Sequence, residues 1–244
     1  MNDIPYVTIA APIRNRDFIL NHYLDHILNL EYPKKKIALF FLLNDSTDQS
    51  ESILRQFKGR YQAQYNRITI ETYNRNVPPD TRTTDTRNKH IYNHLSVLKN
   101  YIMRKVKTEK LLFIDSDILV SNSVINNLLK SDKDIVSGLI YNGYLVDPEY
   151  PYRYPNIMKL NERNTYEHIT NRSISNAPYT KNQNLIKVDL TGAVWMLDKA
   201  VYKKIKFGFH PQGEDAYFCA MAQKNGFELW CDTGTFCTHV MSNK

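Results

Sequence analysis

The stretch that decides the fold of this chain is Lys110-Leu111-Leu112-Phe113-Ile114-Asp115-Ser116-Asp117-Ile118-Leu119-Val120. Its apolar run has the length of a strand that is buried on both faces of a parallel sheet. Asp115 and Asp117 interrupt the run where such a strand would leave its sheet, at the edge where open α/β sheets bind ligands. Burying an unpaired carboxylate costs on the order of several kcal/mol, so we expect both side chains to face a cation, hydrogen-bond donors or water. Hard oxygen ligands beside a cleft suit Mg2+ or Mn2+ shared with substrate phosphates.

A purely structural role for this acidic pair is the alternative. The chain contains a second Asp-x-Asp triplet, Asp132-Lys133-Asp134, which we interpret as a solvated turn before a strand. Capping does not require both aspartates of the first pair, because Ser121 or Ser123 already offers an N-cap to the helix expected over 124–130.

The order of elements around the central strand predicts an α/β fold with a mostly parallel sheet flanked by helices. Strand and helix patterns alternate through the first sixty residues, which is typical of a parallel sheet covered on both faces. A long helix from Ile91 to Val106 then leads into the central strand. We expect strands at 6–11, 37–43, 68–73, 134–141, 186–189, 191–197 and 228–231, and helices at 18–28, 50–57, 124–130, 200–205 and 216–224.

The segment from Tyr141 to Thr180 has no sustained periodicity and is rich in Tyr, Asn, Pro and Arg. Irregular segments of this length in compact domains are usually binding surfaces or lids, or else are disordered, and the tyrosines favour a binding surface. Tyrosine rings stack on sugars or fill interfaces, and the alternative is that they only pack an irregular lobe. The tyrosines concerned are Tyr141, Tyr144, Tyr150, Tyr152, Tyr154 and Tyr166.

The bulk properties suit one domain. With 244 residues and 42% hydrophobic content, the chain can build a sizeable core. It has no apolar run long enough to span a membrane, and its start lacks the regions of a signal peptide, so we expect a cytoplasmic protein. Its three cysteines have no zinc-like spacing, so we expect reduced thiols in a core. The net charge of +7 would suit nucleic acid, an anionic membrane surface or a phosphorylated ligand.

Six short motifs, taken in order along most of the chain, resemble the GT-A glycosyltransferases. The resemblance is to the family 2-like branch and its relatives, the procollagen galactosyltransferases and the Anp1-type mannosyltransferases. It implies one Rossmann-like GT-A domain, with residues 1–120 binding the nucleotide sugar and 121–244 binding the acceptor around an irregular lobe at 141–185. The motifs are Ala11-Pro12-Ile13-Arg14-Asn15, Leu30-Glu31-Tyr32-Pro33-Lys34-Lys35-Lys36-Ile37, Asn44-Asp45-Ser46-Thr47-Asp48, Phe113-Ile114-Asp115-Ser116-Asp117, Thr191-Gly192-Ala193 and Gly213-Glu214-Asp215.

The resemblance also implies roles for the donor side of the site. Pro12 and Arg14, with Asp45, would bracket the nucleotide of a sugar donor, and Asp45 would accept from the base or ribose. Asp115, with Ser116 beside it, would face the diphosphate, and Arg82, Arg87 or other bases of that loop would help to hold it. The metal ligands implied are Asp115, Asp117 and His239, although an isolated histidine also serves structural roles.

On the acceptor side, the resemblance implies that Asp215 is the general base of an inverting transfer, with Glu214 as the second candidate. Helix-dipole stabilisation alone could also explain carboxylates at this position. Gly192 and Ala193 would form the floor under the sugar. Trp195 or the lobe tyrosines, Tyr141 among them, would pack on the acceptor.

The function expected is therefore a hexosyl transfer that depends on Mn2+ or Mg2+, from a UDP-sugar in preference to GDP-mannose, to an acceptor hydroxyl. The acceptor is left open between glycan, protein and lipid; no nucleic acid is expected, and peripheral membrane contact stays open. One alternative is a non-catalytic carbohydrate- or nucleic-acid-binding protein. Another is a sugar-phosphate nucleotidyltransferase, which would need a glycine-rich loop where this chain has Ala10-Ala11-Pro12-Ile13.

Overall fold

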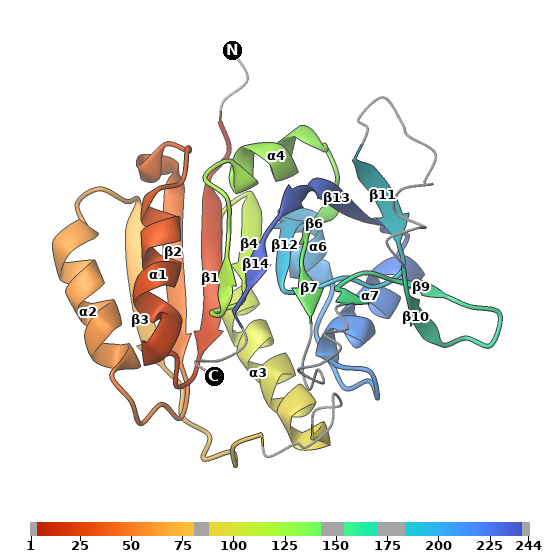
Figure 1. Cartoon of the computed structure of the whole chain (residues 1–244), viewed down its shortest axis with the longest axis horizontal. Coiled ribbons are helices and arrows are strands. Elements are labelled where there is room, and N and C mark those ends of the chain that lie inside the picture. The colour runs from red at the N-terminus through yellow and green to blue at the C-terminus, as the bar shows by residue number, and fades with distance from the viewer. Residues whose placement is uncertain (1–3, 81–87, 143–153, 170–183, 241–244) are drawn as a thin grey trace, which may run out of the picture.

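A computed structural model describes residues 4–80, 88–142, 154–169 and 184–240, and its centre is an eight-stranded sheet with helices on both faces (Figure 1). The order of the strands is β11-β13-β6-β12-β4-β1-β2-β3. β12 runs antiparallel to both of its neighbours and β11 runs antiparallel to β13, whereas the other pairs are parallel. The predicted α/β class with a mostly parallel sheet is confirmed. The strands are β1 (Val7–Ile13), β2 (Ile37–Leu43), β3 (Arg67–Thr72), β4 (Lys110–Ile114), β6 (Ile135–Leu139), β11 (Leu185–Val188), β12 (Val194–Asp198) and β13 (Leu229–Phe236).

The central strands are apolar on both faces because each face is covered by helices. In β2, Leu39 and Phe41 point into one hydrophobic cluster, and Phe40 and Leu42 point into the other. Successive strand residues face opposite sides, so a continuous apolar run fills both cores at once. This is why the run Ile37–Leu43 matches β2 at both ends.

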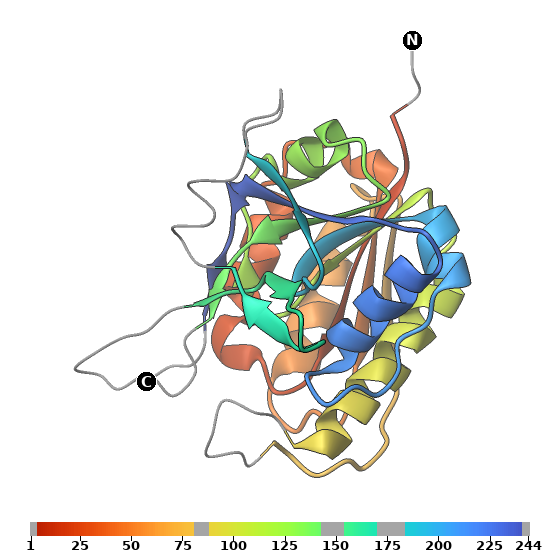
Figure 2. The ribbon, with the colours of Figure 1, turned by 90° about the vertical axis from the view of Figure 1, so that its right-hand side faces the viewer.

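Two groups of helices cover the sheet. α1, α2 and α4 contribute to the first cluster, and α3, α6 and α7 contribute to the second. Figure 2 shows α3 and α7 on the same side of the sheet, and the two helices are in contact. The helices are α1 (Asp17–Leu28), α2 (Ser50–Tyr61), α3 (Lys89–Lys105), α4 (Val124–Lys130), α6 (Lys199–Lys204) and α7 (Glu214–Lys224), with a short 3-10 helix η1 (Lys34–Lys36).

The lobe contains more regular structure than the sequence predicted. β7 (Tyr141–Asn142) pairs with β8 (Tyr154–Pro155), and β9 (Met158–Leu160) pairs with β10 (Tyr166–His168). Strands of two or three residues are too short to show an alternating pattern. Tyr144, Tyr150 and Tyr152 lie outside the described residues.

Two predictions from the bulk properties can be compared with the structure. The cysteines Cys219, Cys231 and Cys237 are free and buried, which confirms their place in the core. None of the helices in the described part of the chain has the length and apolar character needed to span a bilayer. The cytoplasmic location stays a prediction.

Candidate functional site

The acidic pair occupies the turn that follows β4. The backbone N–H of Asp115 donates to the Ala193 carbonyl at 2.9 Å, which ties this turn to the start of β12. Ser116 and Asp117 are buried, and Asp115 is half-buried. Burial, together with the neighbouring Asp115 and Asp117 carboxylates, raises the pKa of Tyr23 above its ordinary value. The turn is therefore a concentration of negative charge at the carboxyl edge of the sheet.

Asp117 faces two positively charged or basic groups. Nη2 of Arg16 lies 3.0 Å from its Oδ2, and Nε2 of His239 lies 3.8 Å from its Oδ1. His239 is brought there by the pairing of β14 (Thr238–His239) with β5 (Ile118–Leu119). Its Nδ1 lies 2.9 Å from Oδ1 of Asn142. Because an amide oxygen only accepts, Nδ1 of His239 carries a proton in this contact, and Nε2 is the ring nitrogen on the side of Asp117.

The donor set at this turn fits a divalent cation by its chemistry. Asp115, Asp117 and His239 supply two carboxylates and an imidazole to the lining of a common cavity. Across the described residues, however, no three His, Cys, Asp or Glu side chains are grouped closely enough to hold a metal. In this arrangement Arg16 is the cation that contacts Asp117.

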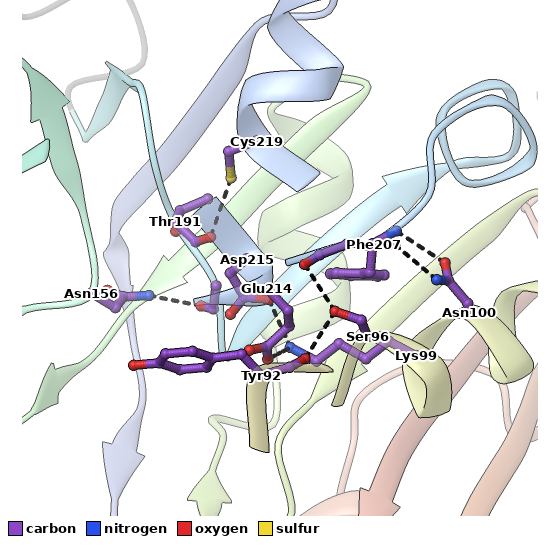
Figure 3. Close-up of polar contacts among 12 residues, drawn as sticks. Tyr92, Ser96, Lys99, Asn100, Asn156, Thr191, Phe207, Glu214, Asp215 and Cys219 are labelled. Carbon is purple, nitrogen blue, oxygen red and sulfur yellow. Dashed lines mark hydrogen bonds and ion pairs between the residues drawn. The ribbon is translucent and has the colours of Figure 1, made fainter. Parts of the chain in front are cut away.

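The second acidic pair begins α7 and is bound to a lysine of α3 (Figure 3). Nζ of Lys99 lies 2.8 Å from Oε1 of Glu214 and 2.7 Å from Oδ1 of Asp215. Burial raises the pKa of Asp215 to about 7, with Glu214 and Asp115 acting in the same direction and Lys99 acting against them. A carboxylate of this kind is suited to accept a proton near neutral pH.

Gly192 lies directly against this carboxylate. A Cβ on Gly192 would come within 2.2 Å of Oδ2 of Asp215. Nδ2 of Asn156 donates to the Gly192 carbonyl at 2.9 Å, and Ala193 adopts a φ of 68°. Gly192 and Ala193 both line the cavity, so the turn predicted as the floor of the site also joins its two acidic walls.

A cavity of about 260 Å³ lies between the two acidic pairs. The predicted residues that line it share a position at the carboxyl edge of the sheet or at the start of α7. They are Pro12, Asp115, Ser116, Asp117, Gly192, Ala193, Glu214, Asp215 and His239.

Arg14 and Asp45 lie close together but do not line this cavity. Arg14 donates from Nη2 to the Val77 carbonyl at 2.7 Å, and Asp45 accepts from the backbone N–H groups of Arg75, Asn76 and Val77. Partial burial of Asp45 is outweighed by these N–H donors, which hold its pKa below the ordinary value. Both side chains therefore organise the loop after β3, and their contact with a nucleotide stays a prediction. Arg82 and Arg87 lie outside the described residues.

The two aromatic residues predicted at the acceptor lie elsewhere. Trp195 is fully buried, with its ring 5.0 Å from Phe218 and 5.9 Å from Phe207. It packs in the second hydrophobic cluster and is absent from the lining of the cavity. Tyr141 packs on Phe236 at 5.9 Å and is absent from the cavity wall.

Sequence reasoning missed several residues of the wall. Lys99 was detectable, because it follows Leu95 by four positions and precedes Ile102 by three, which places a lysine on the apolar face of α3. His168 was also missed; its ring lies 4.4 Å from that of Tyr154, one of the lobe tyrosines predicted to pack on the acceptor, and both residues line the cavity. Burial lowers the pKa of His168, so its ring is neutral.

Comparisons with known proteins agree with this architecture. The family model Anp1 matches residues 2–186. Procollagen galactosyltransferase 2 of Homo sapiens is 25% identical over 146 residues, which cover 56% of this chain and 22% of that protein. The chain thus spans about a quarter of the length of the curated relatives that it matches.

Two solved structures have a similar fold. The mannosyltransferase PcManGT of Pyrobaculum calidifontis, in complex with GDP-Man and Mn2+, aligns with a TM-score of 0.65 at 15% identity, covering 100% of this chain and 59% of that one. TarS 1-349 of S. aureus, in complex with UDP-GlcNAc, aligns with a TM-score of 0.60 at 16% identity, covering 97% of this chain and 59% of that one. The predicted GT-A fold is confirmed.

Proposed function

The chain belongs to the Anp1 family, and from that premise we propose that it is a glycosyltransferase that moves a hexose from a nucleoside-diphosphate sugar to an acceptor hydroxyl. The observation that carries the proposal is the cavity itself. Its lining includes Asp115, Asp117 and His239 from the segments around β5 and β14, and Glu214 and Asp215 from the start of α7. Group transfer from a diphosphate needs charge neutralisation at the leaving group and a base at the nucleophile, and this cavity offers residues for both.

We assign the diphosphate to the wall after β4. Arg16 lines the cavity and presents a guanidinium group, which suits phosphate oxygens. Asp115, Asp117 and His239 would hold Mn2+ or Mg2+, supported by their donor chemistry and by the Mn2+ bound in PcManGT. Such an ion would neutralise the negative charge that develops on the leaving diphosphate. Pro12 and Ser116 would lie along the same wall, and Arg14 and Asp45 would hold the nucleotide through the loop that they organise.

We assign the acceptor hydroxyl to Asp215. In an inverting transfer, the acceptor oxygen bonds to the anomeric carbon, the bond from that carbon to the diphosphate oxygen breaks, and Asp215 takes the hydroxyl proton. Tyr154, one of the lobe tyrosines already expected at the acceptor, and His168 line the cavity from the lobe, and we expect these two residues to contact the acceptor in place of Trp195 and Tyr141.

We propose UDP-hexose as the donor to test first. GDP-mannose is the second donor to test. Both nucleotides are included because the two structural neighbours bind GDP-Man and UDP-GlcNAc. A nucleotidyltransferase is disfavoured because β1 continues without a glycine to Ile13, so that no glycine-rich loop follows it. A binding protein for carbohydrate or nucleic acid stays the alternative from a different class.

A panel of UDP- and GDP-sugars, each with and without Mn2+, tests the proposal. We expect at least one sugar nucleotide to raise the melting temperature and to release its nucleotide when an acceptor is present. A metal requirement would appear as loss of both effects with EDTA. A protein that binds sugar nucleotides but releases none with any acceptor would be a binding module, which contradicts the proposal.

A further inference from the structure

We propose that Lys99 is a positioning residue that, with the space left by Gly192, fixes Asp215 as the base and restricts Glu214 to the role of a buried counter-ion. This inference rests on the proposed function and decides between the two carboxylates that start α7. It concerns a contact between residues more than a hundred positions apart in the sequence.

Lys99 is placed as a core residue. It is 2% exposed, and its Nζ lies 5.2 Å from the centroid of the Phe207 ring. Ser96, one turn earlier in α3, donates to the Gly208 carbonyl at 2.9 Å. Asn100, the next residue, donates from Nδ2 to the Phe207 carbonyl and accepts from the Phe207 N–H, each at 2.9 Å. The helix is thus clamped to the segment before α7, and the ammonium group has little freedom to move (Figure 3).

The two carboxylates bound by this ammonium differ in exposure. The Glu214 side chain is 7% exposed and the Asp215 side chain is 24% exposed. One ammonium group beside two carboxylates leaves a net negative charge, and burying such a charge costs stability. A function in the cavity would explain why both acids are present. A purely structural ion pair would need only one of these acids. Since both line the cavity but Asp215 is the more exposed, Asp215 is the one placed to reach a substrate.

Each oxygen of Asp215 has its own constraint. Lys99 donates to Oδ1 at 2.7 Å, and Oδ2 occupies the space that a side chain on residue 192 would fill. The Gly192 backbone is in turn held by Asn156, whose Nδ2 also donates to the Gly138 carbonyl at 3.2 Å. The carboxylate is therefore fixed from both sides, which is the condition for productive orientation of a base.

Four variants test this inference, with kcat and the donor KM measured separately. We expect Lys99→Met to lower kcat by roughly 100-fold, the scale of a misplaced catalytic group, with the donor KM within about twofold of wild type. Lys99→Arg keeps the charge and should recover part of kcat. Glu214→Gln should retain most of kcat, whereas Asp215→Asn should lose it. Lys105→Met, an exposed lysine on the same helix, is the matched control and should behave as wild type.

If Lys99→Met fails to fold, Lys99→Met combined with Glu214→Gln removes one positive and one negative charge and is used in its place. A wild-type kcat in the Lys99 variants, or loss of kcat in Glu214→Gln with activity kept in Asp215→Asn, would overturn the inference while leaving the proposed function intact. If the wild-type protein transfers no sugar at all, the proposed function fails instead. A crystal structure of the Lys99 variant then decides the positioning role: a rotated Asp215 supports it, and an unmoved Asp215 overturns it.

Discussion

Replacing Gly192 by alanine should lower kcat strongly, because the new side chain would displace the carboxylate of Asp215. The added methyl group would lie 2.2 Å from Oδ2 and 2.8 Å from Cγ of Asp215, where ordinary van der Waals contact needs about 3.4 to 4 Å. The carboxylate must move by about 1 Å or more, because Asn156 holds the backbone on the other side. Displacement of a catalytic group by this distance costs roughly 100-fold in kcat, equivalent to about 2.7 kcal/mol on the barrier.

The assay is steady-state transfer with the best donor of the panel, alongside thermal unfolding. Overpacking should lower the free energy of unfolding by about 1 to 3 kcal/mol. Gly59→Ala is the matched control, since nothing lies within 4 Å of its Cβ position in α2, and it should keep wild-type activity with equal or greater stability. A Gly192→Ala protein with kcat within about twofold of wild type would refute the assignment of Asp215 as a fixed base.

Three further outcomes follow from single side chains. Asp117→Ala should abolish metal-enhanced nucleotide binding in a folded protein, whereas Asp134→Ala, in the other acidic triplet, should keep it. Calorimetry measures this binding, and equal binding in both variants would contradict a metal role for Asp117. Because burial raises the pKa of Asp215 to about 7 and a base must be ionised, kcat/KM should fall about tenfold per pH unit as the pH drops below that value; a flat profile from pH 5 to 8 would exclude Asp215. Asp198→Ala removes the acceptor for the Ala200 N–H at the start of α6 and should cost about 1 kcal/mol in denaturant unfolding; an unchanged midpoint would contradict the capping role.

The fold could be predicted from the sequence because a strand that is buried on both faces is apolar at every position. The runs at Ile37–Leu43 and at 111–114 in β4 are apolar throughout, and this is the pattern of strands between two helix layers. A continuous apolar run does not show whether a given side chain faces the core or a ligand. Trp195 was therefore assigned to the acceptor, although it faces the core with Phe207 and Phe218.

The site could be predicted only where its residues end elements. Asp115 and Asp117 follow a strand and Glu214 and Asp215 start a helix, so their common position at one edge of the sheet follows from the topology. Contacts inside the site between residues far apart in the sequence have no local sequence pattern. Nothing local indicates that Lys99 meets the start of α7, even though a lysine on an apolar helix face is itself a signal of a buried partner.

The hairpin of β9 and β10 in the lobe was hard to predict because a turn closes it and its three-residue strands have no hydrophobic pattern. Between β9 and β10, Oδ1 of Asn161 accepts from the N–H groups of Arg163 and Thr165, and Asn164 adopts a φ of 59°. Asparagine tolerates this conformation and closes such turns with its side chain. The two asparagines three positions apart were the available signal for the hairpin.

A crystal structure with Mn2+ and a UDP-hexose tests the proposed site most directly. We expect an anomalous manganese signal beside Asp117 and His239, the diphosphate near Arg16, and the anomeric carbon of the sugar turned toward Asp215. A structure in which Asp117 stays paired with Arg16, with no ion beside it and the nucleotide bound outside this cavity, would contradict the account.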